Sequence, residues 1–284
     1  MSWLNDYAPS MGAALAYYTL FSLAPLLVIA IAVAGLFFGR EAAQGEIVAQ
    51  IQGLIGYKGA TAVQDLLQST NQPAQSVLAA VVSFIAMVIG ATTVFAELQN
   101  DLDRIWRVPA PLKVNNLWVL LHTRLLSFGM VLGLGFLLLV SLVISAIIAA
   151  LGKLNNGFFE GQDVFFQTLN FSISFVITTV LFAMIYKLMP RASVAWKDVW
   201  VGAAVTALLF EAGKILISLY LGTTSIASGF GAAGSLVVLL VWVYFSAQIF
   251  LLGAEFTWVY AHEYGSKSGN PIGEVPLATL HQDE

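Results

Sequence analysis

The chain has 284 residues, of which 59% are hydrophobic and only 10% are charged. Soluble domains carry about 25% charged residues, so the composition excludes an ordinary soluble domain and predicts an all-α polytopic membrane protein. The formal net charge of -4 argues against nucleic acid as a partner, because RNA or DNA binding calls for a basic face. The absence of cysteine excludes disulfides, thiolate chemistry and cysteine-ligated metal.

Six apolar segments are long enough to cross a bilayer, which requires about 20 residues in a helix. Six crossings place both termini on one side, and most extramembrane Lys and Arg fall in segments on that side. The positive-inside rule therefore predicts cytoplasmic termini. We expect one transmembrane domain over residues 1–264 and a flexible cytoplasmic tail over 265–284. The predicted transmembrane helices are residues 11–39, 75–96, 125–151, 164–189, 199–221 and 235–260.

The first span, residues 11–39, contains a proline within its apolar run. Pro25 removes one backbone hydrogen bond and is expected to kink the helix. Tyr18 and Ser22 share a helix side with Pro25, so we expect this side to face the protein interior. Tyr18 is then a candidate hydrogen-bonding group, and Pro25 either shapes a cavity or makes a packing kink without a ligand.

The first external loop, residues 40–73, carries apolar residues at helical spacing. Glycines near residues 56–59 interrupt the pattern, so we expect two short amphipathic helices. These helices would lie in the membrane interface or cap the bundle.

The second span ends in polar residues at helical spacing. They lie at i, i+3, i+4 and i+7, which places them on one face and predicts a polar ridge on the cytoplasmic side. We expect a solvated helix end here rather than a binding site, because charges at a membrane interface need no special explanation. Ridge residues are Glu97, Asn100, Asp101 and Arg104.

The last two spans carry ionisable side chains at membrane depth. An ionised side chain at the bilayer centre costs about 2.5–3.5 kcal/mol, so such residues normally face a protein interior or a watery cavity. We expect the polar stripes of the two helices to face each other or a shared cavity. They would then bind a polar substrate group or an ion, or act as struts between helices. Candidate binding residues are Glu211, Lys214, Gln248, Glu255 and Tyr18, and candidate cavity-shaping residues are Pro25, Gly229 and Gly231.

Four stretches of the sequence resemble segments of the BrkB/YihY family of bacterial inner-membrane proteins. They are AYYTLFSLAPLL, FAELQNDLDRIWRVP, WKDVWVGAAVTALLFEAGKILISLYL and LVWVYFSAQIFLLGAEF. The resemblance implies a six-helix inner-membrane protein. Some members are linked to serum resistance and others to envelope lipid or lipopolysaccharide traffic, with a transporting role suspected.

An older label for this family is ribonuclease BN-like, and the residues do not support it. Metal-assisted RNA hydrolysis needs clustered ligands around an open coordination position. The three histidines, His122, His262 and His281, are far apart and match no metal-binding spacing. We therefore expect no enzyme activity, no metal site and no cofactor.

Two functions fit the sequence. The first is a transporter or flippase of a lipid or other amphipathic envelope substrate, supported by the proline-interrupted first span and the charges at membrane depth. The second is a non-transporting membrane scaffold for envelope-assembly or virulence functions. Expected partners are membrane lipids, an amphipathic substrate, and a second copy of the chain or an envelope protein.

Overall fold

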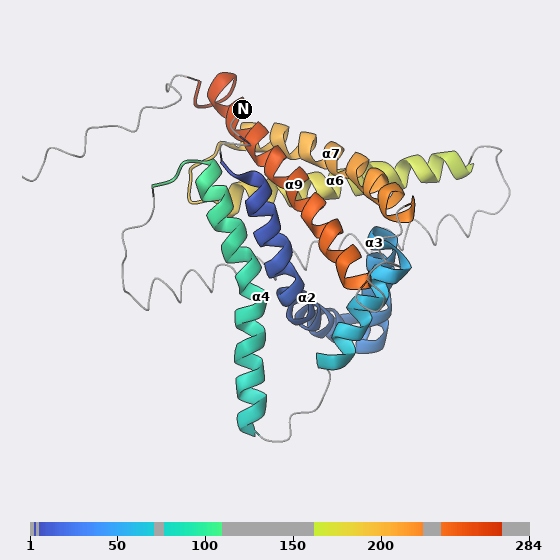
Figure 1. Cartoon of the computed structure of the whole chain (residues 1–284). Helices are drawn as coiled ribbons and strands as arrows, with labels where there is room; N and C mark the ends of the chain where they lie inside the picture. Colours follow the sequence, from blue (N-terminus) through green and yellow to red (C-terminus); the bar gives the residue numbers. More distant parts are fainter. Residues whose placement is uncertain (1–2, 4–5, 71–76, 110–161, 224–233, 269–284) are drawn as a thin grey trace, which may run out of the picture.

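The computed structural model describes residues 3, 6–70, 77–109, 162–223 and 234–268 (Figure 1). Every regular element in this part of the chain is an α-helix, which confirms the predicted all-α class. The helices are α2 (Ala8–Phe38), α3 (Arg40–Thr70), α4 (Val77–Ile105), α6 (Gln162–Leu188), α7 (Trp196–Thr223) and α9 (Gly234–Glu263).

Four of these helices are long and apolar enough to cross a membrane. The qualifying segments are Ala8–Leu36 in α2, Phe171–Leu188 in α6, Trp196–Ile217 in α7 and Leu236–Glu263 in α9. Helix α4 covers the predicted span 75–96 but is not among the four, and the predicted span 125–151 lies outside the described residues. The fold is therefore that of a helical protein with at least four candidate crossings, and six remains a prediction.

The prediction of two short amphipathic helices in the first external loop is wrong. Residues 40–70 form one continuous helix, α3. A glycine inside a helix costs only about 1 kcal/mol relative to alanine, and tertiary packing readily compensates this cost. Here Val63 and Leu67 of α3, beyond the glycines, are buried against Ile31 of α2 and Leu239 of α9, so packing holds the second half of the helix in place.

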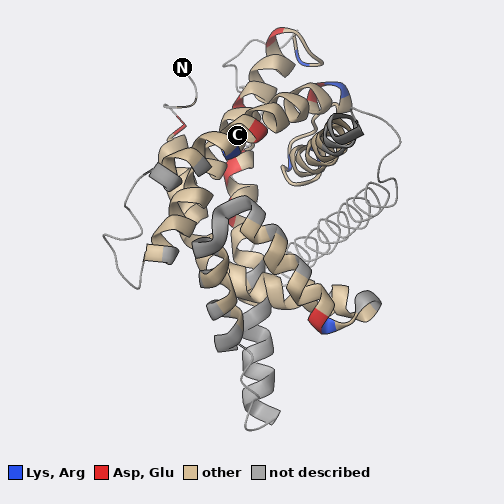
Figure 2. Cartoon of the chain, turned by 90° about the vertical axis from the view of Figure 1, so that its right-hand side faces the viewer, with Lys and Arg blue, Asp and Glu red and all other residues tan. Residues whose placement is uncertain are grey.

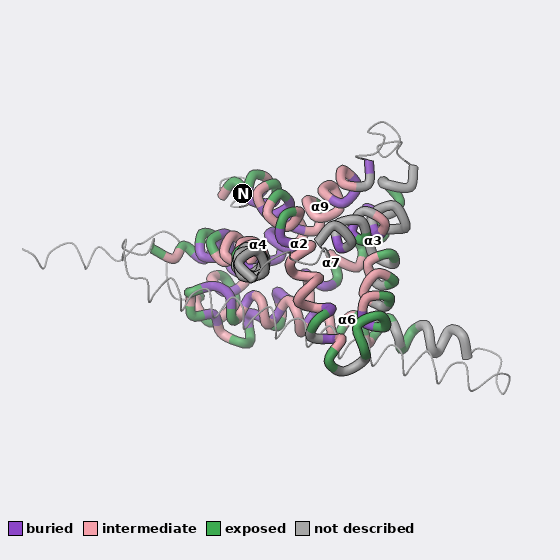
Figure 3. Tube along the Cα trace, turned by 90° about the horizontal axis from the view of Figure 1, so that it is seen from below, coloured by how far each residue is buried: buried purple, intermediate pink, exposed green. Residues whose placement is uncertain are grey.

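Helix α9 is the centre of the arrangement. It packs against α2, α3, α4 and α7, and aromatic side chains of α6, which packs mainly on α7, also contact Phe250 of α9. Figure 3 shows buried residues concentrated where helices meet and exposed residues along α6. Contacts with the different faces of α9 thus position its neighbouring helices.

Small residues allow α7 and α9 to approach closely. A Cβ atom added at Gly202 of α7 would overlap the Thr257 hydroxyl of α9, and one at Gly253 of α9 would overlap Thr206 of α7. Close backbone approach at small residues is how membrane helices gain packing energy without a hydrophobic driving force. A buried hydrogen bond also links α6 to α9: the Tyr186 hydroxyl of α6 donates to the carbonyl of Phe250 at 2.7 Å.

We expect Gly202→Ala to lower the melting temperature of the purified chain in detergent. The added methyl group must displace Thr257, and overpacking of this kind costs about 1–3 kcal/mol. Gly45→Ala in α3 is the matched control. A Cβ atom there meets nothing within 4 Å, so alanine should stabilise the helix by up to about 1 kcal/mol. Equal melting temperatures for the Gly202→Ala variant and wild type would contradict the packing shown for α7 and α9.

Candidate functional site

Several helix ends meet at one end of the molecule, and we call this region the polar end. It comprises the start of α2, the last turns of α4, the connection between α6 and α7, and the last turns of α9 with residues 264–268. Most of the charged residues coloured in Figure 2 lie toward this end. Beneath them lies an apolar core to which all five helices contribute, including Met11, Leu102, Trp106, Tyr186, Met189, Val199 and Trp258.

The predicted polar ridge of α4 lies at the polar end, but it is only partly solvated. Asn100 and Arg104 are exposed, as expected of a helix end in water. Asp101, however, is only 5% exposed, because this side of α4 packs into the core next to Leu102 and Ile105. The expectation of a solvated helix end is therefore wrong for Asp101.

Burial changes the proton affinity of Asp101, which lies beyond the predicted span 75–96. Loss of hydration raises the pKa of its carboxyl to about 7. The Glu97 carboxylate raises this pKa further, while the Arg104 guanidinium lowers it. Asp101 is therefore a group that titrates near neutral pH.

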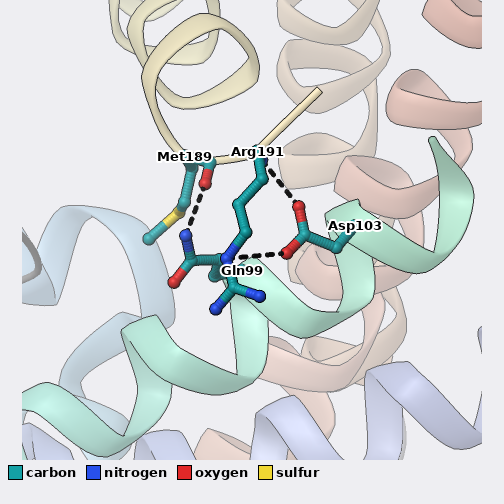
Figure 4. A network of polar contacts seen from close by, with 4 residues as sticks. All are labelled: Gln99, Asp103, Met189 and Arg191. Atoms are coloured by element: carbon teal, nitrogen blue, oxygen red, sulfur yellow. Dashed lines mark hydrogen bonds and ion pairs between the residues drawn. The ribbon is translucent and has the colours of Figure 1, made fainter. Parts of the chain in front are cut away.

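A second buried carboxylate of α4 links two parts of the chain that are far apart in sequence (Figure 4). The Asp103 carboxylate accepts a 2.7 Å hydrogen bond from the backbone N–H of Arg191 and lies 3.6 Å from its guanidinium. One turn earlier, the Gln99 amide donates to the Met189 carbonyl at 3.0 Å. These contacts fix α4 to the connection between α6 and α7.

A third carboxylate holds the end of α9. Asp198, buried in the first turn of α7, accepts hydrogen bonds from the Ser266 hydroxyl at 2.6 Å and from its backbone N–H at 3.2 Å. Sequence reasoning missed both Asp198 and Asp103, because their partners lie 68 and 88 residues away. Their side chains hold the polar end together.

Glu211 and Lys214 form the local pair that their spacing predicts. The Lys214 ammonium lies 2.8 Å from a carboxylate oxygen of Glu211. Gly213 meets Ile249 of α9, and residues two positions apart lie about 160° apart around a helix. Glu211 therefore points away from α9. Of the two expected arrangements, direct facing of the polar stripes of α7 and α9 is thus wrong, and a shared cavity stays a prediction.

The polar face of α9 is turned toward α2 instead. The Gln248 amide donates to the Ala8 carbonyl at 3.3 Å and packs directly on Gly12. Glu255 lies seven residues further along α9, hence on the same face, and is only 3% exposed. Gln248 thus belongs to the seam between α2 and α9, apart from the ion pair of α7, while Glu255 lies on the same face of α9 two turns nearer its C-terminal end.

The remaining candidate residues either lie at packing positions between helices or fall outside the described residues. Pro25 lies inside the continuous helix α2, and a Cβ atom at Gly90 of α4 would be 3.2 Å from its Cγ. This contact supports the interpretation of Pro25 as a packing position. Tyr18 is partly buried, with its ring 5.7 Å from that of Tyr17. Gly229 and Gly231 lie outside the described residues.

Across the part of the chain that the structure describes, no group of three His, Asp or Glu side chains could hold a metal ion.

We expect stability to depend on pH through Asp101. Because its pKa is raised from 3.8 to about 7 on folding, the folded chain binds this proton more tightly than the unfolded chain. The resulting stabilisation is complete below about pH 4 and is lost as the pH rises through about 7. Melting temperatures should therefore fall between about pH 5 and pH 8, and fall less for Asp101→Asn.

Glu263→Gln, which removes an exposed carboxylate of α9, should retain the wild-type decline. An unchanged decline in Asp101→Asn would show that another group is responsible.

The chain is similar to membrane proteins from several bacteria. A UPF0761 membrane protein from Verminephrobacter eiseniae is 29% identical over 257 residues, which cover 89% of this chain and 58% of that protein. One from Pseudomonas aeruginosa is 28% identical over 259 residues, covering 89% of this chain and 59% of that protein. A third, from Pseudoalteromonas translucida, is 29% identical over 248 residues, which cover 86% of this chain and 78% of that protein.

The chain thus spans less than two thirds of the length of the first two relatives. No solved structure matches it. A family model described as virulence factor BrkB matches residues 2–274, nearly the whole sequence. The resemblance carried by the four sequence stretches is thereby confirmed, and the chain belongs to the BrkB family of membrane proteins.

Proposed function

We propose that this chain is a non-enzymatic protein of the bacterial inner membrane that moves a lipid or other amphipathic envelope substrate. The observation that carries the proposal is the burial of Glu255 inside a helix that is apolar enough to cross the membrane. A carboxylate at membrane depth is costly, and such residues typically mark a substrate or ion pathway.

The surroundings of Glu255 support this role. Gln248, on the same face of α9, donates to α2 through its amide nitrogen, while its amide oxygen is buried without a hydrogen-bond partner among the described residues. A buried carbonyl oxygen without a partner loses its hydration free energy. The buried polar face of α9 therefore offers a carboxylate and a hydrogen-bond acceptor to a polar headgroup or a coupling ion.

The orientation we propose follows from the polar end. This end carries the basic side chains Arg104, Arg107, Lys187, Arg191, Lys197 and Lys267. Because cytoplasmic segments are enriched in Lys and Arg, the polar end would face the cytoplasm. Asp6 and Ser268 lie near the two ends of the described part of the chain, and both belong to the polar end. This arrangement agrees with cytoplasmic termini.

The second candidate is a non-transporting scaffold. The closed ion pair between Glu211 and Lys214 favours it, because each charge of this pair already has its partner on the same helix. If Glu255 proves to act in the same way, as a strut, the scaffold becomes the better account.

We expect the purified chain to accelerate lipid scrambling in proteoliposomes, and Glu255→Gln to slow it by about tenfold or more, equivalent to about 1.4 kcal/mol. The reason is that glutamine keeps the size of the side chain but loses its charge. The assay follows a fluorescent lipid that becomes accessible to a membrane-impermeant quencher.

Glu263→Gln is the matched control on α9, since its carboxylate is exposed, and it should scramble at the wild-type rate. A second variant, Glu211→Gln with Lys214→Met, removes the locally closed pair and should also retain activity. No scrambling by wild type would contradict the lipid substrate. Full activity of Glu255→Gln would contradict the role of Glu255.

A further inference from the structure

One corner of the polar end brings cationic side chains over aromatic rings. The Arg107 guanidinium lies 4.8 Å from the ring centre of Trp258, and the Lys267 ammonium lies 5.0 Å from that of Trp106. Arg104 lies 5.4 Å from the ring centre of Tyr7. These six residues, from the start of α2, the end of α4 and the end of α9, form what we call the cation corner.

The charges at the polar end are sorted by depth. Its carboxylates Asp101, Asp103 and Asp198 are buried, whereas Arg104 and Arg107 are exposed. The described acids nearer the surface are Asp6, Glu97 and Glu263, and His262 stacks on Trp258 with ring centres 4.4 Å apart. The two exposed guanidinium groups of the cation corner are therefore accessible to a molecule approaching from outside.

Arg107 is the most available of these cations. Its side chain is 53% exposed, and its ion pair with Asp6 is long, at 3.8 Å. An exposed pair of this length contributes little, so the guanidinium retains most of its capacity to bind an oxyanion in its planar, forked geometry.

The backbone at this corner is also unusual. Tyr7 and Arg107 are the two non-glycine residues of the described chain with positive φ, at 59° and 54°. The left-handed region is uncommon for side chains of this size. Both residues belong to the cation corner, where these backbone angles bring the guanidinium groups and the rings of two helix ends together.

We propose that the cation corner binds the phosphate headgroup of an anionic membrane phospholipid. Trp106 and Trp258 are buried at the ends of α4 and α9, and their rings hold the Lys267 and Arg107 side chains at this end of the helical bundle. Basic groups between helices at the cytoplasmic side of a membrane attract anionic headgroups. The apolar surfaces of the adjoining helices would accommodate the acyl chains, while Arg104, Arg107 and Lys267 contact the phosphate.

The test measures lipid preference at equilibrium, so its outcome does not depend on whether the chain transports lipid. The full chain is reconstituted into phosphatidylcholine vesicles with a trace of spin-labelled phosphatidylglycerol or spin-labelled phosphatidylcholine. The motionally restricted fraction of each label gives the preference for the anionic lipid. We expect wild type to prefer phosphatidylglycerol, and Arg107→Gln with Lys267→Gln to reduce that preference by about fivefold for each cation, equivalent to about 1 kcal/mol each.

Two matched variants separate the corner from general charge effects. Arg40→Gln with Lys197→Gln removes one arginine and one lysine elsewhere and should retain the preference. Arg107→Lys with Lys267→Arg keeps both charges and should retain most of it, so that a loss caused by misfolding is distinguished from a loss of charge. Equal preference for both lipids in wild type, or an equal loss in the Arg40→Gln, Lys197→Gln variant, would overturn the proposal.

A final arm distinguishes a lipid headgroup from a soluble phosphate. Excess inorganic phosphate at constant ionic strength should leave the preference for phosphatidylglycerol unchanged, because the lipid is also held by its acyl chains. Complete loss of the preference would mean that the corner takes a soluble phosphate, and the assignment to a membrane lipid would be wrong.

Discussion

The close packing of α9 against two different neighbours is the constraint on which the rest of the structure depends. Toward α7, Gly253 and Thr257 leave no room for larger side chains, and toward α2, Gln248 lies directly on Gly12. Because both contacts involve glycine, the backbones approach closely, and the rotation of α9 about its own axis is fixed. That rotation decides which helix meets the buried carboxylate of Glu255.

The polar end follows from the same arrangement. Once α9 is fixed between α2 and α7, the ends of α4, α7 and α9 converge, and their carboxylates are enclosed. Asp103 and Asp198 obtain donors from Arg191 and Ser266, so their burial is compensated by hydrogen bonds. Burial raises the pKa of Asp103 as well, although Arg191 lowers it, and it raises the pKa of Asp101 to about 7. The interior of this end is thus acidic, and the exposed guanidinium groups of Arg104 and Arg107 lie at its surface.

Helix positions could be predicted from the sequence because apolar length is a local property. The described helices α2, α4, α6, α7 and α9 cover five of the six predicted spans, and the local pairing of Glu211 with Lys214 follows from a spacing of three residues. The continuity of α3 was missed, since the glycine cost that predicts a break is compensated by contacts with α2 and α9 that no local pattern contains.

The neighbours of each helix face could not be predicted in the same way. Periodicity places Gln248 and Glu255 on one face of α9, but it does not say which helix covers that face. The small residues do carry this information: Gly202, Gly213 and Gly253 mark the contact between α7 and α9, and Gly12 marks the one between α2 and α9. Asp198 and Asp103 were missed because hydrogen bonds over 68 and 88 residues leave no trace in spacing.

The most direct measurement is disulfide cross-linking in native membranes, which the absence of cysteine makes straightforward. The account holds that the polar face of α9 is turned toward α2. Gly12→Cys with Gln248→Cys should therefore cross-link rapidly under mild oxidation, whereas Glu211→Cys with Gln248→Cys should not. Efficient linkage of positions 211 and 248, without linkage of 12 and 248, would place the polar face of α9 against α7 and contradict the account.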